Sequence, residues 1–223
     1  MALMSELVEL CERHNVDKAS TLSVFARRLR EAGRVSKAGR GRGAAHMTFL
    51  DAARFLIACA ATDHPEKAAD SEFVFSNLVL SSSGSVNAEI DPKIEGAETL
   101  DACLSATLEL IANGKILERA KADWKEKLET LSGGPVNFHA FIVIHRSHVG
   151  AQMRVLGSQL FFYHPALIDV MKAGDEGGYP AQKPFLKAFE RETHRFRSGK
   201  NLTAEFEMEL LKAVADLIAG NET

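Results

Sequence analysis

The spacing of apolar residues changes from a helical to an alternating pattern after about residue 131, and this change constrains the fold more than any other feature. Up to about residue 131 the apolar residues recur every three or four positions, as on the buried face of an α-helix. After Gly133-Gly134-Pro135 they alternate and are rich in β-branched types, first over 136–145 and then over Met153–Leu156 and Gln159–His164. The sequence therefore predicts an α+β fold that is mainly α, with a small antiparallel sheet near residues 136–164.

Residues typical of helix ends divide the remaining chain into helices. A first helix should end near His14–Asn15, because Asn tolerates the left-handed conformation that closes helices. The second should open at Ala19 or Ser20 and end at Gly33, with its arginines pointing outward. Thr48 is a good N-cap, and Asp51 suits the first turn that follows it. Further helices are expected from Pro65 to Leu80, over about 97–112 and 115–131, from near Pro184 to about Arg197, and from the N-cap Thr203 to a stop at Gly220.

The segment 81–96 is rich in Ser and Gly and contains Asp-Pro, which is typical of a linker. On this pattern the chain divides into a helix-turn-helix-like module over 1–80 and an α+β domain for dimerisation or effector binding over 97–223. The charge distribution agrees with such a division. Residues 1–54 hold ten Lys/Arg against six Asp/Glu, whereas the rest of the chain holds seventeen against twenty-four. A basic end on an acidic body indicates a module that binds a polyanion.

Composition places the chain among globular proteins, since 46% of its residues are hydrophobic and 26% are charged. Cys11, Cys59 and Cys103 are far apart in apolar helical contexts, so we expect buried thiols in a reducing compartment. No Cys/His spacing predicts a zinc site, and no apolar stretch reaches the roughly 18 residues of a membrane span. The amino-terminal residues lack the basic start of a signal peptide. We therefore expect a cytoplasmic protein without membrane contact, metal or cofactor.

The strongest functional signal is a cluster of basic residues near the amino end. Residues 27–42 contain seven basic residues and one acidic residue, Glu31, within a chain whose total charge is −3. Arginine donates in a planar fork that matches phosphate oxygens and the edge of guanine, and glycine lets backbone approach a polyanion closely. This pattern indicates contact with double-stranded DNA through Arg27, Arg28, Arg30, Arg34, Lys37, Arg40 and Arg42.

Helix, short turn and helix is also the plan of a helix-turn-helix. The runs ELCERHNV, LREAGRV and the arginine-bearing loop before MTFLDAARFLIA resemble a winged helix-turn-helix module, loosely of the MerR type, over about a quarter of the chain. That resemblance implies transcription regulation by a homodimer, in a bacterium or a phage. Two alternatives remain open: a phage DNA-packaging recognition subunit, similar to a small terminase, and a protein-interaction module whose basic loop meets an acidic partner.

A second basic stripe occurs at four-residue spacing, which places its members along one helix face. A solvated helix face is the interpretation that we favour for this stripe. The alternatives are a second phosphate-contacting patch and a patch that meets the acidic body of a partner subunit. Its members are Lys183, Lys187, Arg191 and Arg195.

The sequence offers little sign of catalysis. His139, His145 and His148 form a histidine cluster, but His139 and His145 would lie about 20 Å apart on a strand, too far to share a metal. His145 and His148 could meet across a turn, with no acid or thiol close in sequence to complete a site. No Walker-type loop or G-x-S-x-G motif is present in the sequence, so we expect no enzyme activity.

Overall fold

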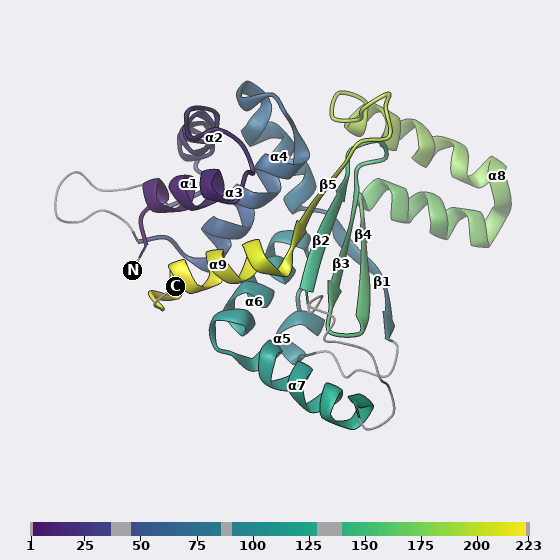
Figure 1. Ribbon diagram of the computed structural model, residues 1–223. Helices are drawn as coiled ribbons and strands as arrows, with labels where there is room; N and C mark the ends of the chain where they lie inside the picture. Colours follow the sequence, from purple (N-terminus) through teal and green to yellow (C-terminus); the bar gives the residue numbers. More distant parts are fainter. Residues whose placement is uncertain (1, 37–45, 86–90, 129–139, 222–223) are drawn as a thin grey trace.

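The computed structural model describes residues 2–36, 46–85, 91–128 and 140–221. Within them the chain folds as an α+β protein, as the change of hydrophobic period predicts (Figure 1). In chain order its elements are α1 (Met4–Arg13), α2 (Ala19–Glu31), α3 (Phe49–Ala61), the 3-10 turn η1 (Pro65–Lys67), α4 (Ala68–Ser76), β1 (Val79–Ser85), α5 (Pro92–Glu95), α6 (Leu100–Ala112), α7 (Lys115–Leu128), β2 (Ala140–His145), β3 (Gly150–Val155), β4 (Ser158–Tyr163), α8 (Pro165–Thr193), β5 (Thr203–Glu207) and α9 (Met208–Ala219).

The described strands form one five-stranded sheet in the order β1-β4-β3-β2-β5, and every neighbouring pair is antiparallel. The strands β2, β3 and β4 follow one another as a meander, the arrangement that the alternating pattern predicts. In the middle of the sheet Ile142 pairs with Met153 on one side and with Phe206 on the other. Alternate residues of β2 are buried, so one face of the sheet belongs to the core.

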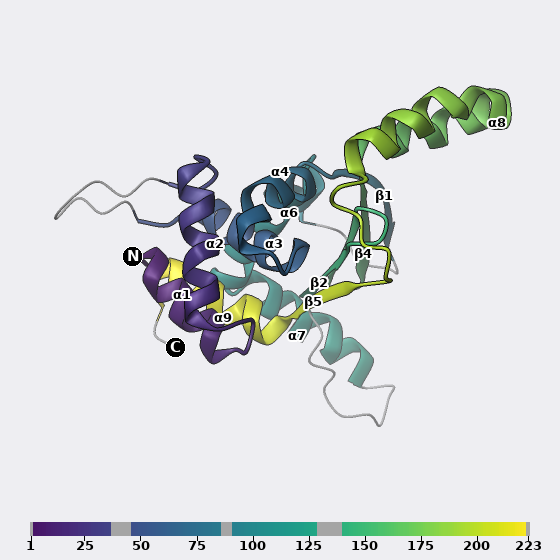
Figure 2. The same cartoon turned by 90° about the horizontal axis from the view of Figure 1, so that it is seen from above.

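Helices cover that buried face. Seen from above, the strands stand on one side of α3, α6 and α9 (Figure 2). α9 packs against α1, α3, α6 and β2, and α3 packs against α4, α6 and both β2 and β5. Most of the buried apolar residues form one cluster, with members from Ala2 to Ile218. The two ends of the chain therefore contribute to the same core.

This shared core corrects the expected division at a linker over 81–96. Much of that segment is regular structure, because β1 extends to Ser85 and α5 covers Pro92–Glu95. The backbone N–H of Leu100 donates to the carbonyl of Leu78 at 2.9 Å, which ties the start of α6 to the strand. Serine and glycine still pair as a strand here because β4 supplies the hydrogen-bonding partner. Residues 86–90 lie outside the described residues.

The helix ends near the amino terminus match their sequence signals. Asn15 has φ 57° and Gly33 has φ 70°, so both occupy the left-handed region where α1 and α2 stop. Thr48 caps α3 by accepting a hydrogen bond from the backbone N–H of Asp51. The buried stripe of α2 is also the expected one, formed by Leu22, Phe25, Ala26 and Leu29.

Several expected elements have different bounds. The helix after Pro65 ends at Ser76, so Leu78 and Leu80 lie beyond it. Thr203 is not an N-cap but the first residue of β5, and α9 begins at Met208. The run Thr-Ala-Glu-Phe-Glu alternates, and pairing with β2 makes it a strand. Glu205 and Glu207 therefore occupy exposed positions of that strand and not the first turn of a helix.

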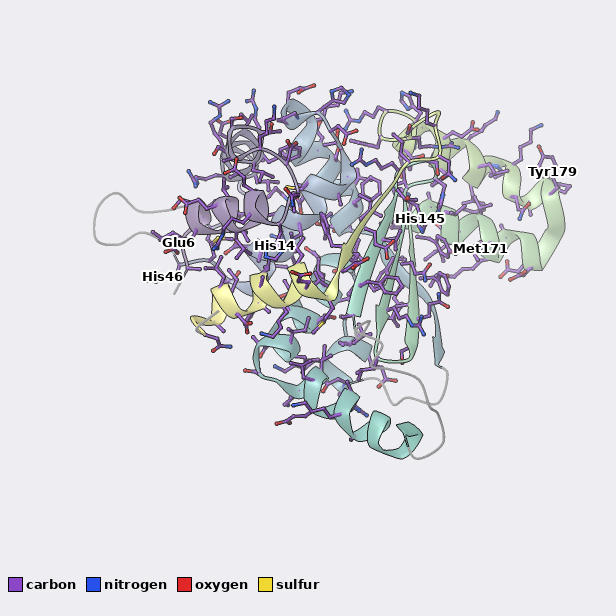
Figure 3. All side chains as sticks on the ribbon, in the orientation of Figure 1. Glu6, His14, His46, His145, Met171 and Tyr179 are labelled. Carbon is purple, nitrogen blue, oxygen red and sulfur yellow. The ribbon has the colours of Figure 1, made fainter. Side chains whose placement is uncertain are left out.

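The expected helix from Pro184 is part of a longer element, α8, which bends into a hairpin. Gly178, at φ 66° and ψ −163°, interrupts the helix, and Pro180 follows in the first turn of the second arm. The hairpin extends away from the body (Figure 2). Tyr179 lies at its turn and Met171 on its first arm (Figure 3), and both side chains are exposed.

Candidate nucleic-acid interface

The C-terminal half of α2 presents the first three arginines of the basic cluster to solvent. Its apolar stripe is buried against the core, which turns the opposite face outward. Arg27, Arg28 and Arg30 are all exposed on this face, as expected from their spacing. The sequence therefore placed these three side chains correctly on the surface.

Glu31 is the acid that Arg27 and Arg28 contact. Arg28 donates to it at 3.1 Å, and Arg27 lies 3.8 Å from it. The three side chains are roughly half exposed, and ion pairs of this kind contribute at most about 1 kcal/mol. Arg30 has no acidic partner within ion-pair distance among the described residues. A polyanion can therefore displace the pairs with Glu31 at little energetic cost.

Arg34 has a different role from the one its position in the cluster indicated. Its Nε donates to Glu72 at 2.6 Å and an Nη donates at 3.1 Å, which makes a bidentate pair with a fully buried carboxylate. The hydrogen bonds to Glu72 raise the pKa of Arg34 further above its ordinary value, against the opposing effect of burial. Arg54 joins this network by donating to Asp101 at 2.9 Å and to the Arg34 carbonyl at 3.0 Å. Arg34 is thus committed to the protein's own acids and leaves the set of candidate contacts.

A single carboxylate holds the two ends of the basic loop. Asp51 accepts hydrogen bonds from the backbone N–H and hydroxyl of Ser36, at 2.8 and 2.9 Å, and from the same groups of Thr48, both at 2.9 Å. Its side chain is buried, so these bonds are shielded from water. The other loop cations, Lys37, Arg40 and Arg42, lie outside the described residues. His46 precedes Met47, whose backbone N–H donates to the Ala2 carbonyl, and the His46 side chain is exposed (Figure 3).

An aromatic ring beside this loop was missed from the sequence. The side chain of Phe73, in α4, is 55% exposed. The guanidinium of Arg34 lies over the ring, 5.1 Å from its centroid. The helical pattern around Phe73 gave no hint of this exposure, because the buried positions of α4 include the polar Glu72 and Ser76.

The second basic stripe begins on the second arm of α8, but Arg195 lies beyond the end of that helix at Thr193. All four of its members are exposed: Lys183, Lys187, Arg191 and Arg195. Arg191 pairs with its neighbour Glu192 at 3.2 Å. In Figures 1 and 2 this arm lies at the opposite end of the molecule from α2. The three members of the stripe on this arm are therefore separate from the cluster on α2.

The histidine cluster does not form a metal centre in the part of the chain that is described. His145 and His148 do meet across the turn after β2, with stacked rings 5.0 Å apart. Burial lowers the pKa of both rings, and the positive charge of Arg197 adds to the effect on His148. Both rings therefore favour the neutral form. His139 lies outside the described residues.

The three cysteines are free, with Cys11 and Cys103 buried and Cys59 partly buried. Burial raises the pKa of both Cys11 and Cys103 to about 12 and raises that of Cys59 as well. These thiols are protonated near neutral pH and are poor nucleophiles. Their role in the described structure is packing.

Comparisons with known proteins assign no family or function to this site. Every helix in the described ranges is too short or too polar to cross a lipid bilayer. The chain matches no protein-family model, no curated protein and no solved structure in these comparisons.

Proposed function

We propose that this protein binds double-stranded DNA through the C-terminal half of α2 and the glycine- and arginine-rich loop that follows it. The observation that supports the proposal most is the group of exposed arginines at positions 27, 28 and 30. These arginines lie just before the loop that Asp51 anchors at Ser36. The sequence of that loop adds Lys37, Arg40 and Arg42. Without Arg34, residues 27–42 still contain six basic residues and one acidic residue, Glu31.

The position of these arginines favours contact with the DNA backbone over base reading. In a helix-turn-helix the recognition helix reads bases with residues near its N-terminus. The arginines of α2 lie instead in its C-terminal half, where an edge of the helix meets phosphates. Phe73 offers an exposed ring at the same site, and such rings stack on bases when a strand opens.

The proposal includes transcription regulation by a homodimer, because two copies double the number of phosphate contacts and can read two half-sites. The mass of the protein and of its DNA complex, measured by analytical ultracentrifugation, tests this point. A dimer supports the regulator. A ring of eight or more subunits would favour the DNA-packaging alternative.

Fluorescence anisotropy with labelled duplex DNA at several salt concentrations tests DNA binding. Each neutralised phosphate contributes roughly 0.9 to the slope of log affinity against log salt, so six contacts give a slope near −5. Replacement of Arg27, Arg28 and Arg30 by Ala should flatten the slope by about 2 to 3. A matched variant loses three exposed lysines from other elements: Lys115, Lys121 and Lys172.

The control variant should bind DNA nearly as the unchanged protein does, since it has lost the same charge at other places. Equal affinity and slope for both triple variants would contradict an interface on α2. A second variant, with Arg40 and Arg42 changed to Ala, tests the loop. Negligible DNA binding by the unchanged protein at about 100 mM salt would favour an acidic protein partner instead.

A further inference from the structure

A second cationic site, distinct from the interface on α2, lies where the end of α3 meets the segment after α8. A pocket of about 240 Å³ opens here. One wall comes from Thr62 and Lys67, in the chain between α3 and α4, and from Ser71 of α4. The opposite wall comes from residues 195–198. Arg146, at the end of β2, contributes from between the two walls.

Four cations line this pocket, and Asp63 is the carboxylate that lines it with them. Arg146 is largely buried and is held in place, since its Nε donates to the Ala60 carbonyl at 2.6 Å and it pairs with Asp63 at 2.8 Å. Arg197 donates to the Ser147 carbonyl at 3.2 Å. Both guanidinium groups are therefore positioned before any ligand arrives.

The other two lining cations are Lys67 and Arg195. Neither Lys67 nor Arg195 has a carboxylate within ion-pair distance among the residues that the structure describes. The guanidinium of Arg195 stacks on the ring of Phe196 at 4.7 Å, which leaves its N–H edge available. Glu66, which lies 3.5 Å from the His64 ring, is exposed and is not part of the pocket lining. The pocket thus keeps an excess of positive charge that no described side chain compensates.

The chemistry of the lining fits a phosphate group better than a single carboxylate. A phosphate monoester carries a charge of about −1.5 to −2 at neutral pH and has three strong acceptor oxygens. Arginine forks and a lysine ammonium supply matching donors. The Thr62 hydroxyl accepts a hydrogen bond from the backbone N–H of His64 at 3.1 Å, so its own proton can be donated. The volume is below that of drug-sized ligand sites, which limits the occupant to a small molecule.

We propose that this pocket binds the phosphate group of a small phosphorylated molecule, with Lys67 and Arg195 as the ligand-binding cations and Arg146 as the cation that positions the pocket floor. The site does not depend on the proposed DNA contacts, because it shares no residue with α2 or its loop. Free phosphate and the phosphate of a nucleotide present the same group, and the two are compared in the test.

The test is a titration of the ¹⁵N-labelled full chain with inorganic phosphate, and separately with adenosine monophosphate, followed by NMR at constant ionic strength. We expect saturable shifts confined to amides of residues 62–71 and 195–198, with a Kd of about 1 mM or tighter. The double variant Lys67→Ala/Arg195→Ala should bind phosphate at least about tenfold more weakly than the unchanged protein, because each substitution removes a charge-assisted hydrogen bond to the phosphate. The control Lys115→Ala/Lys172→Ala loses the same charge elsewhere and should bind as the unchanged protein does.

Three results would overturn the proposal: no saturable shift, the same shifts with chloride alone, or unchanged phosphate binding by the Lys67→Ala/Arg195→Ala variant. Both substitutions remove exposed side chains, so we expect the variant to fold. A thermal melt checks this. DNA affinity of the two double variants completes the test. A selective loss of DNA binding by Lys67→Ala/Arg195→Ala, without any phosphate binding, would assign these cations to a nucleic-acid surface and reject the small-molecule pocket.

Discussion

At the scale of single residues, the basic cluster separates into two kinds of arginine. Arg27, Arg28 and Arg30 reach solvent, whereas Arg34 closes a bidentate pair with the buried Glu72. Burial of a carboxylate is unfavourable unless hydrogen bonds replace its water. Glu72 receives them from Arg34 and also from the Ser76 hydroxyl. The pair fixes the chain at the start of the basic loop and is therefore structural.

Replacement of Glu72 by Ala should destabilise the protein by about 3 kcal/mol, because it leaves Arg34 partly buried without its acid. Urea denaturation followed by circular dichroism measures the change in the free energy of unfolding. The control is Glu66→Ala, which removes an exposed acid in the turn before α4 and should change stability by less than about 0.5 kcal/mol. Equal midpoints for the two variants would show that the buried pair contributes nothing.

The sequence could predict only the first kind of arginine. The outward direction of Arg27, Arg28 and Arg30 follows from the helical period of α2, which is a local property. The partner of Arg34 lies 38 residues further along the chain, in a helix whose buried face includes polar groups. Nothing near Arg34 in the sequence distinguishes it from its neighbours in the cluster. The pocket at Lys67 and Arg195 could not be predicted for the same reason, because its walls come from segments more than a hundred residues apart in the sequence.

At the scale of elements, the helix ends near the amino terminus followed local signals, whereas the predicted helix bounds at Leu80 and Thr203 were wrong where a strand pairs with a distant partner. Asn15, Gly33 and Thr48 end or begin helices as expected, because their conformations and hydrogen bonds are local. By contrast, β1 and β5 exist because β4 and β2 offer edges to pair with. The first arm of α8 was not expected, since Gly174, Gly177 and Gly178 weaken the helical signal where the hairpin turns.

Gly178 should be essential for the turn of the α8 hairpin. Its φ of 66° and ψ of −163° fall in a region that is open almost only to glycine, and no atom lies within 4 Å of an added Cβ. Gly178→Ala should therefore strain the backbone by about 1 to 3 kcal/mol without a clash. Amides of α8 should exchange hydrogen roughly 5- to 100-fold faster, as measured by mass spectrometry. Gly199→Ala, at a glycine with open space and no left-handed φ, should leave exchange in α8 unchanged.

At the scale of the whole molecule, the first and last helices share one core, so the proposed DNA interface is part of the body and not a separate module. Nine of the thirteen residues of α3 are buried, which places this helix at the centre. Its neighbours α6, α9 and β2 all come from the part of the chain after the expected linker. The composition of 81–96 predicted a boundary because flexible residues usually mark one. Elements on both sides of that segment pack into one core, so no domain boundary lies there.

The fragment 1–80 should consequently fail to fold alone, which the sequence on its own would not have predicted. Without α6 and α9 the apolar faces of α1 and α3 would be exposed to water, and the fragment would lose the hydrophobic burial that offsets chain entropy. We expect poorly dispersed amide signals in its NMR spectrum and no cooperative thermal transition, whereas the full chain should unfold in one transition seen by all probes. The fragment should also bind DNA more weakly than the full chain, because the arginines of α2 would no longer be held on one face. A dispersed spectrum with cooperative unfolding of residues 1–80 would contradict the shared core and restore an independent amino-terminal domain.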